Sequence, residues 1–195
     1  MLVMVIGLFL FLAIHLVPAN VDLKNGLIAR FGATGYKVLF SVVSLIGLAL
    51  IILGFYKLHL HPGKNPILWD PPTWTKHIAF LLMIPAMICL VAAYVPSRIR
   101  TALKHPMLVA IKIWALAHLI ANGDLASLML FAGFLAFAVY DRISVKKRGA
   151  LGPLGDKTGG AAGDITVVAV GLALYAFMLW AGHALLIGVP LLNTP

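Results

Sequence analysis

Six apolar stretches divide this chain of 195 residues, and most approach the ~20 residues that an α-helix needs to cross ~30 Å of hydrocarbon. Inside hydrocarbon, backbone amide and carbonyl groups must find hydrogen-bond partners within the protein, which leaves α-helices as the conformation for apolar stretches of this length. The fourth and fifth stretches are shorter than the others. The six cover residues 1–17, 36–55, 77–95, 107–121, 125–140 and 165–189.

The composition supports this interpretation and excludes a soluble domain. Hydrophobic residues make up 62% of the chain and charged residues 11%, whereas soluble domains are roughly 45–50% apolar and 25% charged. We therefore expect an all-α fold, a polytopic transmembrane helix bundle with about six spans, in one domain over residues 1–195. Within it, the glycine-rich segment 141–164 is expected to be a mobile loop before the last helix, 165–189.

The positive charges are distributed unevenly between the two sides of the predicted membrane. Eleven of the fifteen lysines and arginines follow the first, third and fifth apolar stretches, and three lie on the other side. The positive-inside rule then places both termini outside. The net charge of +9 comes from short basic segments beside the spans, which predicts contact with anionic lipid and no nucleic-acid partner. The eleven are Lys24, Arg30, Lys37, Arg98, Arg100, Lys104, Arg142, Lys146, Lys147, Arg148 and Lys157.

Three connecting segments carry structural signals of their own. Apolar side chains recur at near-helical spacing in residues 18–35, which predicts a short amphipathic helix at the membrane interface. Residues 57–76 contain four prolines and are expected to form an extended cap on the outer face. Only residues 122–124 separate the fourth and fifth stretches, which predicts a tight helical hairpin with Asp124 capping the second helix.

Ionisable side chains inside an apolar stretch indicate where function lies. A lysine or arginine at mid-depth costs about 2.5–3.5 kcal/mol on insertion scales, so such residues are functional-site hypotheses by default. From a rise of ~1.5 Å per residue, His77, His118 and His183 are predicted at one level in the outer half of three helices. His15 lies about two helical turns deeper. Because two imidazoles suffice for a haem, this convergence is compatible with a b-type haem.

A second polar group lies toward the cytoplasmic end of the fourth stretch. Lys112 follows His105 by seven residues, so both lie on one helix face, and the lysine side chain leans back toward His105. One interpretation is that Lys112 extends to lipid phosphates. The other is that Lys112 and His105, with Arg98 or Arg100 nearby, hold carboxylates such as haem propionates.

Four motifs of this chain are specific enough to indicate a family. They are Ala93-Tyr94-Val95-Pro96-Ser97-Arg98-Ile99-Arg100, Lys104-His105-Pro106-Met107, Trp114-Ala115-Leu116-Ala117-His118-Leu119-Ile120-Ala121-Asn122-Gly123-Asp124 and Val139-Tyr140-Asp141-Arg142. Together they resemble the bacterial NnrU family, and the likeness covers most of residues 5–148. NnrU proteins are named for an association with nitrite and nitric-oxide metabolism, and the same domain forms the plant 15-cis-zeta-carotene isomerase. The resemblance implies a bacterial inner-membrane protein, and the positive-inside rule then places both termini in the periplasm.

The resemblance also implies a cofactor and its ligands. The plant isomerase is a haem b enzyme whose histidine-ligated iron changes ligation with redox state, and its ligands correspond to His15 and His118. These two are therefore the predicted catalytic metal ligands, and His77, His105 and His183 also have counterparts. The plant enzymes carry a cysteine where this chain has Ala115. The implied ligand is a hydrophobic substrate or a small gas, with haem-dependent cis/trans isomerisation or a role in denitrification as the function.

Two other functions remain open from the sequence. One is a non-catalytic membrane factor that assembles or senses denitrification enzymes. The other is an S-adenosylmethionine-dependent methyltransferase, because Lys104-His105-Pro106-Met107 near a tight hairpin is similar to part of such membrane enzymes. Those enzymes follow the hairpin with an Arg-x-x-x-Glu-Glu segment, and residues 141–148 contain no glutamate.

Overall fold

The computed structural model describes residues 1–192 and is built from α-helices, which confirms the predicted all-α class. Two short 3₁₀ helices, Val17–Ala19 and Pro62–Lys64, and a π-helix, Met178–Gly182, lie between them. The α-helices are α1 (Leu2–Leu16), α2 (Val21–Leu60), α3 (Thr73–Ala92), α4 (Arg98–Leu103), α5 (Pro106–Ala121), α6 (Leu125–Lys147), α7 (Ala161–Phe177) and α8 (His183–Ile187).

Five helical segments are long and apolar enough to cross a membrane: Leu2–Ala19, Val21–Leu60, Thr73–Ala92, Leu125–Lys147 and Ala161–Ile187. The sixth predicted span is α5, which is apolar but has only 16 residues. The helix α6 continues to Lys147, past the predicted end at residue 140. Hydropathy marks where a helix leaves the hydrocarbon, whereas hydrogen bonding continues into the polar turns beyond it.

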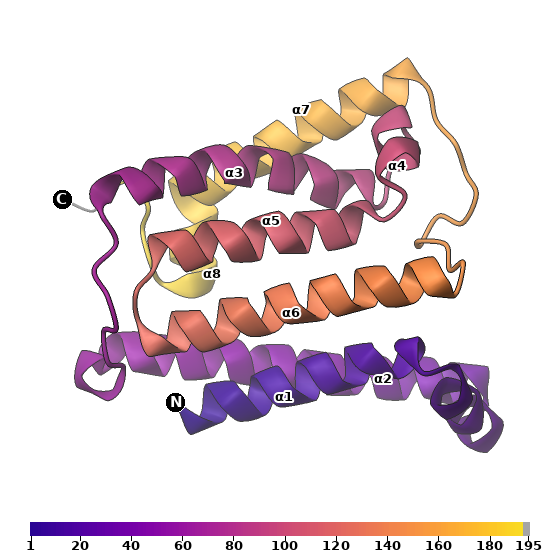
Figure 1. Cartoon of the computed structure of the whole chain (residues 1–195), viewed down its shortest axis with the longest axis horizontal. Helices are drawn as coiled ribbons and strands as arrows, with labels where there is room; N and C mark the ends of the chain where they lie inside the picture. The colour runs from indigo at the N-terminus through magenta and orange to yellow at the C-terminus, as the bar shows by residue number, and fades with distance from the viewer. Residues whose placement is uncertain (193–195) are drawn as a thin grey trace.

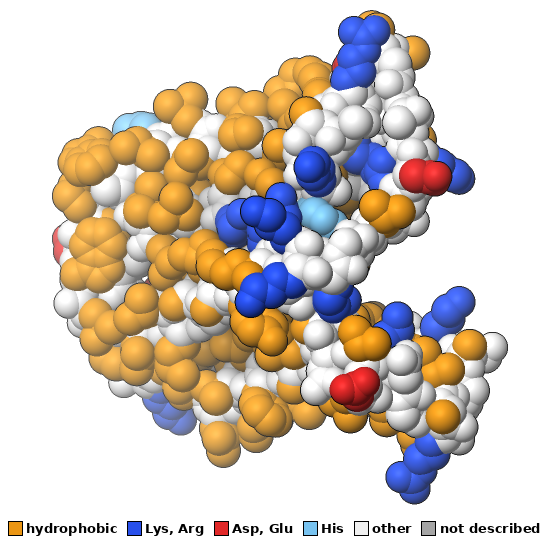
Figure 2. All heavy atoms as spheres, turned by 45° about the vertical axis from the view of Figure 1, so that its right-hand side comes forward, with side chains coloured by type: hydrophobic (Ala, Val, Ile, Leu, Met, Phe, Trp, Pro, Cys, Tyr) orange, Lys and Arg blue, Asp and Glu red, His pale blue; other side chains and the backbone are white. Residues whose placement is uncertain are grey.

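The six spans form a curved row, in which each helix contacts its neighbours (Figure 1). The row runs α2, α1, α6, α5, α3, α7. Connections 17–20, 93–105 and 148–160 lie together at one end of the bundle, and 61–72 and 122–124 lie at the other. Figure 2 shows lysine and arginine side chains gathered at the end that holds connections 17–20, 93–105 and 148–160, which we call the basic end.

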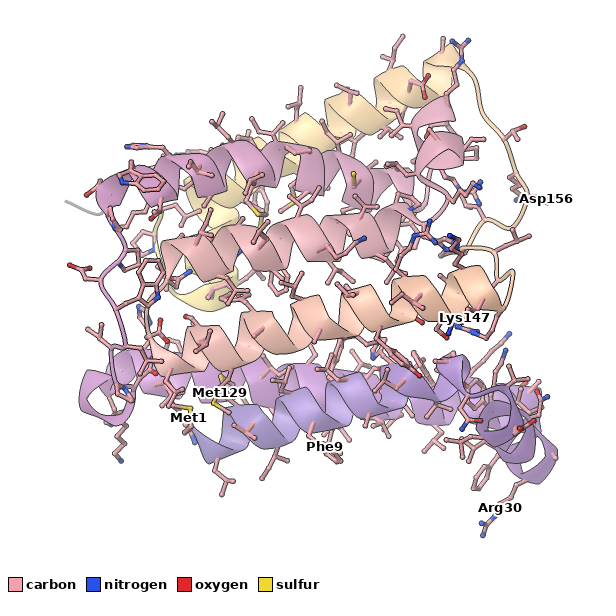
Figure 3. All side chains as sticks on the ribbon, in the orientation of Figure 1. Met1, Phe9, Arg30, Met129, Lys147 and Asp156 are labelled. Carbon is pink, nitrogen blue, oxygen red and sulfur yellow. The ribbon has the colours of Figure 1, made fainter. Side chains whose placement is uncertain are left out.

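The surface between the two ends is apolar, as expected for a protein in lipid. Phe9 is 70% exposed and Trp180 is 83% exposed, while Ala115 and Ala126 are completely buried. In Figure 3, Phe9 projects away from the bundle. Large apolar groups therefore face outward and small ones lie between helices, the arrangement found where helices associate within a bilayer.

The helices α1 and α2 pack closely against each other through glycines. A Cβ atom added at Gly54 would lie 2.4 Å from the backbone nitrogen of Met4, and one added at Gly7 would lie 2.6 Å from that of Ile51. The two helix backbones can approach this closely only because neither glycine has a side chain.

The helix α2 has two parts that meet at Gly32. Gly32 has φ 72° and ψ 165°, which interrupts the helical conformation between residues 21–31 and 33–60. Asn20 caps the first part by accepting a hydrogen bond from the backbone nitrogen of Leu23 at 3.0 Å. The structure agrees with the short separate helix predicted within residues 18–35.

At the opposite end, residues 65–69 form a strap across the α5–α6 hairpin. The backbone nitrogen of Leu68 donates to the carbonyl of Gly123 at 2.8 Å, and that of Leu125 donates to the carbonyl of Pro66 at 3.0 Å. Asn65 donates its side-chain amide to Asp124 at 2.7 Å. The expected extended cap on the outer face is therefore shorter than residues 57–76, because α2 continues to Leu60 and α3 begins at Thr73.

Asp124 caps α6 as predicted, and its carboxylate joins the strap to this helix. It accepts hydrogen bonds from the backbone nitrogen of Ser127 at 2.8 Å and from the Ser127 hydroxyl at 2.6 Å. Burial acts to raise the pKa of Asp124, but the hydrogen bonds from Ser127 and Asn65 outweigh it and hold the pKa below its usual value.

We expect Gly54→Ala to lower the melting temperature of the detergent-solubilised protein, because the new methyl group meets the backbone of Met4. Overpacking of this kind costs about 1–3 kcal/mol. The matched control is Gly26→Ala, where nothing lies within 4 Å of the added carbon. Alanine is the better helix former, so that variant should be unchanged or more stable. Equal effects of the two substitutions would contradict the packing argument.

Asp124→Ala should destabilise the folded state by about 1–3 kcal/mol at neutral pH, through loss of the cap and of a partner for buried donors. Because the pKa of Asp124 is lower in the folded state than in the unfolded state, its carboxylate stabilises the folded protein at pH values above the unfolded-state pKa. This stabilisation is lost as the pH falls through the folded-state pKa. The difference between wild type and variant in melting temperature should therefore narrow in acid. Asp70→Ala, at an exposed position, is the control and should change little at either pH.

Candidate functional site

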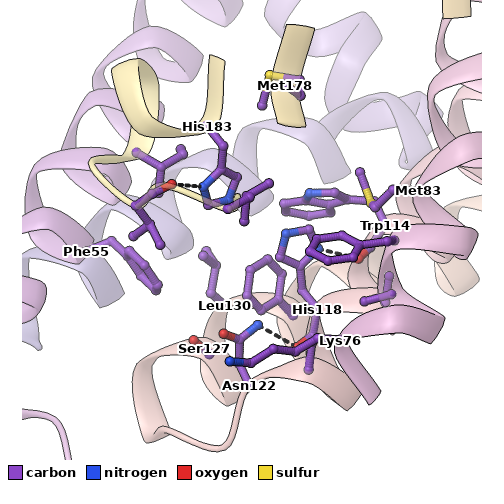
Figure 4. Close-up of a pocket in the computed structure, with 18 of the residues that line it drawn as sticks. Phe55, Lys76, Met83, Trp114, His118, Asn122, Ser127, Leu130, Met178 and His183 are labelled. Carbon is purple, nitrogen blue, oxygen red and sulfur yellow. Dashed lines mark hydrogen bonds between the residues drawn. The ribbon is translucent and has the colours of Figure 1, made fainter. Parts of the chain in front are cut away.

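A cavity of about 380 Å³ opens within the bundle near the strap, between α2, α3, α5, α6 and the segment from α7 to α8. This volume is within the range of roughly 300–1,000 Å³ typical of small-molecule sites. Most of its wall is apolar, with Phe55, Met83 and Leu130 among the residues drawn in Figure 4. Two imidazoles, those of His118 and His183, also line it, and we call it the histidine cavity.

Both histidines are oriented by a hydrogen bond to a backbone carbonyl. His118 Nδ1 lies 2.8 Å from the carbonyl oxygen of Trp114, and His183 Nδ1 lies 2.7 Å from that of Val189. Because a carbonyl oxygen only accepts, each Nδ1 carries the hydrogen and donates it. Each Nε2 therefore keeps its lone pair and is available to a metal or a hydrogen-bond donor.

The two imidazoles face each other across the cavity. Their ring centroids are 6.5 Å apart and their planes differ by 17°. In Figure 4 the side chains of His118 and His183 reach from different helices toward the same space. This arrangement brings together two of the three histidines that the sequence predicts at one level.

Aromatic residues hold the His118 ring from α5 and α6. Phe131 stacks on it with a centroid distance of 4.5 Å, and the Trp114 ring lies 5.3 Å away. Phe131 and Trp114 also contact each other edge to face at 5.0 Å. The imidazole is thus fixed by its hydrogen bond and by two aromatic neighbours.

The last span departs from regular α-helix just before His183. The π-helix Met178–Gly182 ends at this histidine, and such turns are frequent at functional sites. Gly188 then adopts φ 82°, and the chain turns so that the carbonyl of Val189 meets His183 Nδ1. No residue pattern in the sequence indicates the π-helix, so it is not among the elements predicted above.

Polar groups lie at one edge of the histidine cavity. They include Lys76 on α3, Asn122 at the hairpin and the exposed His59 on α2. Lys76 is the one lysine or arginine among the cavity residues that the structure describes, and Figure 4 shows it beside Asn122. From the sequence, Lys76 is one of the three cations on the outer side, and its position directly before His77 is the signal that could have placed it at this site.

The structure does not bring His15 into the histidine cavity. On α1, its Nδ1 hydrogen bonds to the carbonyl of Phe11 at 2.6 Å, and its ring stacks on that of Phe11 at 4.1 Å. Phe40 and Phe137 contact it edge on, at 5.0 and 6.1 Å. His77 also lies outside this cavity, since it is exposed on α3 and is not among the lining residues.

The predicted anion-holding residues are likewise placed away from His118. Arg98 is exposed and pairs with Asp164 at 3.8 Å. His105 lines a second cavity at the basic end, and Lys112 is half-buried on α5 without lining either cavity described. Arg98, His105 and Lys112 therefore lie in three different environments, although all three belong to α5 or to the segment before it.

A metal site built from protein side chains alone is not present in residues 1–192. No group of three or more histidine, cysteine, aspartate or glutamate side chains in this part of the chain is placed to hold a metal ion. Two histidines are enough only where another group supplies the remaining ligands, as a porphyrin does for iron.

Six apolar helices, with an internal cavity lined by two histidines, are the features of a polytopic membrane protein. A family model, described as NnrU protein, matches residues 3–191, and the chain therefore belongs to the NnrU family. The match confirms the predicted family and extends past residue 148 to include the helices that carry His183. No curated protein and no solved structure matches the chain.

Proposed function

We propose that this NnrU protein binds haem b in the histidine cavity, where His118 and His183 would hold the iron. The observation that carries the proposal is that two imidazoles from different helices face one apolar cavity, each with Nδ1 committed to a backbone carbonyl. Each Nε2 is thereby left for a ligand inside the cavity. A carbonyl partner at Nδ1 is also the usual arrangement for a metal-ligating histidine.

The two rings lie near enough for one bound group to meet both, since their centroids are 6.5 Å apart and their planes differ by 17°. The apolar wall suits the face of a macrocycle, and Lys76 at the edge offers a cation to one carboxylate.

This pairing replaces His15 by His183, one of the two histidines, with His77, that the sequence predicts at the level of His118. His118 and His183 are predicted at one level from the rise per residue, whereas His15 is two turns deeper. The aromatic environment of His15, with Phe11 stacked on its ring and Phe40 and Phe137 at its edges, supports a packing role for that side chain.

Bound haem would supply an iron centre whose free coordination position depends on its redox state. The chain's own residues orient and shield that site. The carbonyls of Trp114 and Val189 fix the two imidazoles, and Phe80, Met83 and Met87 keep water from one wall. An apolar cavity of this kind accepts a hydrophobic molecule or a small gas. Isomerisation of a polyene and a role in nitric-oxide metabolism are the two functions that it supports.

The distribution of charge supports an orientation for the protein. The basic end carries most lysines and arginines, so we place it in the cytoplasm of a bacterial cell and both termini in the periplasm. The histidine cavity then lies in the outer half of the inner membrane.

The absorption spectrum of protein expressed with ample haem tests the axial ligands. Wild type should show a Soret band and sharp α and β bands after reduction with dithionite. His118→Ala and His183→Ala should each lower haem occupancy by on the order of tenfold or more, since ligand loss exceeds the effect of losing an outer partner. His15→Ala is the matched control and should keep the wild-type spectrum.

Other outcomes have definite meanings. Loss of the bands in His15→Ala, with His183→Ala unchanged, would restore the pairing that the resemblance implied. Colourless wild-type protein after reconstitution would overturn haem binding and direct attention to S-adenosylmethionine binding. Retained haem without turnover of polyenes would favour a sensing or assembly role.

Imidazole should rescue a variant that lacks the ligand but keeps the cavity. His183→Gly leaves space where the side chain lay, and free imidazole can occupy it and coordinate from the same side. Millimolar imidazole should restore the reduced α and β bands of His183→Gly. It should leave His183→Leu unrestored, because the leucine fills the space. Equal behaviour of the two variants would argue that His183 acts through the fold.

A further inference from the structure

A second cavity, of about 440 Å³, lies at the basic end. It is enclosed by α4, the residues before α5, the last turns of α6 and the segment 149–158. None of the residues that line it also lines the histidine cavity. We call it the basic cavity, because five of its lining residues are Arg100, Lys104, Arg142, Lys146 and Lys157.

Little negative charge balances these five cations. Asp156 is the one carboxylate among the residues that line the basic cavity. The two ion pairs found within the described residues join Arg98 to Asp164 and Arg148 to Asp141. Neither pair includes a residue that lines the cavity. Like charges held around a hollow raise the local potential and favour entry of an anion.

One of the five cations has a structural task. Arg100 is 7% exposed, and its guanidinium donates hydrogen bonds to the carbonyls of Gly155 and Lys157. It thereby holds the segment 149–158 over the cavity. The remaining cations, Lys104, Arg142, Lys146 and Lys157, come from three different parts of the chain and face the same hollow.

The backbone at Lys104, on the rim of the basic cavity, has a strained conformation. Lys104 has φ 62° and ψ −45°, and it is the one residue other than glycine with positive φ in the part of the chain described. Such conformations persist where the surroundings impose them, and they cluster at ligand sites. Here the strain keeps a lysine at the junction of α4 and α5, on the rim of the basic cavity.

The pKa of His105 responds to burial and to the same positive charges. Burial lowers the pKa of His105, and the positive charges of Arg142, Arg100 and Lys104 lower it further, while Asp141 opposes them. The charges that surround the imidazole are therefore mainly positive.

We propose that the basic cavity is a binding site for a phosphate group. Arginine and lysine are the side chains that proteins use for phosphate, through bidentate hydrogen bonds and point charge respectively. The cavity lies where α5 begins and α6 ends, at the ends of apolar spans, where lipid headgroups are expected. The phosphate belongs either to an anionic lipid headgroup or to a soluble ion that enters from the aqueous side.

Thermal unfolding of the full-length protein in a neutral detergent distinguishes these sources. Phosphatidylglycerol, phosphatidylcholine and inorganic phosphate are added separately, the last against chloride at equal ionic strength. A rise in melting temperature with phosphatidylglycerol alone assigns the site to lipid. A rise with inorganic phosphate assigns it to a soluble phosphate. An equal response to phosphatidylcholine and phosphatidylglycerol, with none to phosphate, overturns the proposal.

Paired substitutions on α6 locate the effect. Lys146 lines the basic cavity, and its exposed neighbour Lys147 does not. Arg142→Gln with Lys146→Gln should weaken the apparent affinity for the active probe at least tenfold, whereas Lys147→Gln should match wild type. Equal weakening by both would identify a diffuse surface effect and overturn the site.

Lys157→Gln keeps the test valid if the double variant does not fold. This residue lies in the segment 149–158, outside the helices, and its side chain is exposed at the cavity. It should weaken binding of the same probe by severalfold while its melting temperature without probe stays at the wild-type value. An affinity unchanged by Lys157→Gln, with a folded double variant also unchanged, would contradict the proposal.

Discussion

Polar side chains inside an apolar bundle must find their partners within the protein, and this requirement determines how the spans use their histidines. His15, His118 and His183 each direct Nδ1 to a backbone carbonyl. In the first two the carbonyl belongs to the residue four positions earlier in the same helix. The second ring nitrogen is then left without a local partner, so each imidazole needs either close packing or a ligand. Aromatic rings surround His15, whereas a cavity adjoins the other two.

Much of the fold could be predicted because apolar length and capping residues act locally. The apolar stretches gave the number of spans, and Asp124 gave the start of α6. The predicted end of α6, at residue 140, was wrong because the helix continues to Lys147, where the sequence becomes polar. For the site, the rise per residue indicated that His118 and His183 share a level. It could not indicate which way each ring points, since that depends on helix packing and on the π-helix before His183.

The bundle separates two chemically different cavities along one short helix. His118 lies near one end of α5 and His105 immediately before the other. At about 1.5 Å per residue, the 16 residues of α5 span roughly 24 Å, less than the ~30 Å hydrocarbon core. The bilayer around α5 is therefore expected to thin, which brings each cavity closer to the water layer on its own side. The strap at one end and Arg100 at the other keep both ends of this helix covered.

The π-helix before His183 lets the last span hold an extra residue while His183 stays in the histidine cavity. A π-turn holds one residue more than the α-helix would need. In a regular α-helix, one added residue would rotate every later side chain by about 100° around the axis. The wider turn over residues 178–182 takes up the extra residue, so the side chains beyond it keep their direction. This turn is thus a place where the chain can gain or lose one residue and the scaffold still keeps its second imidazole.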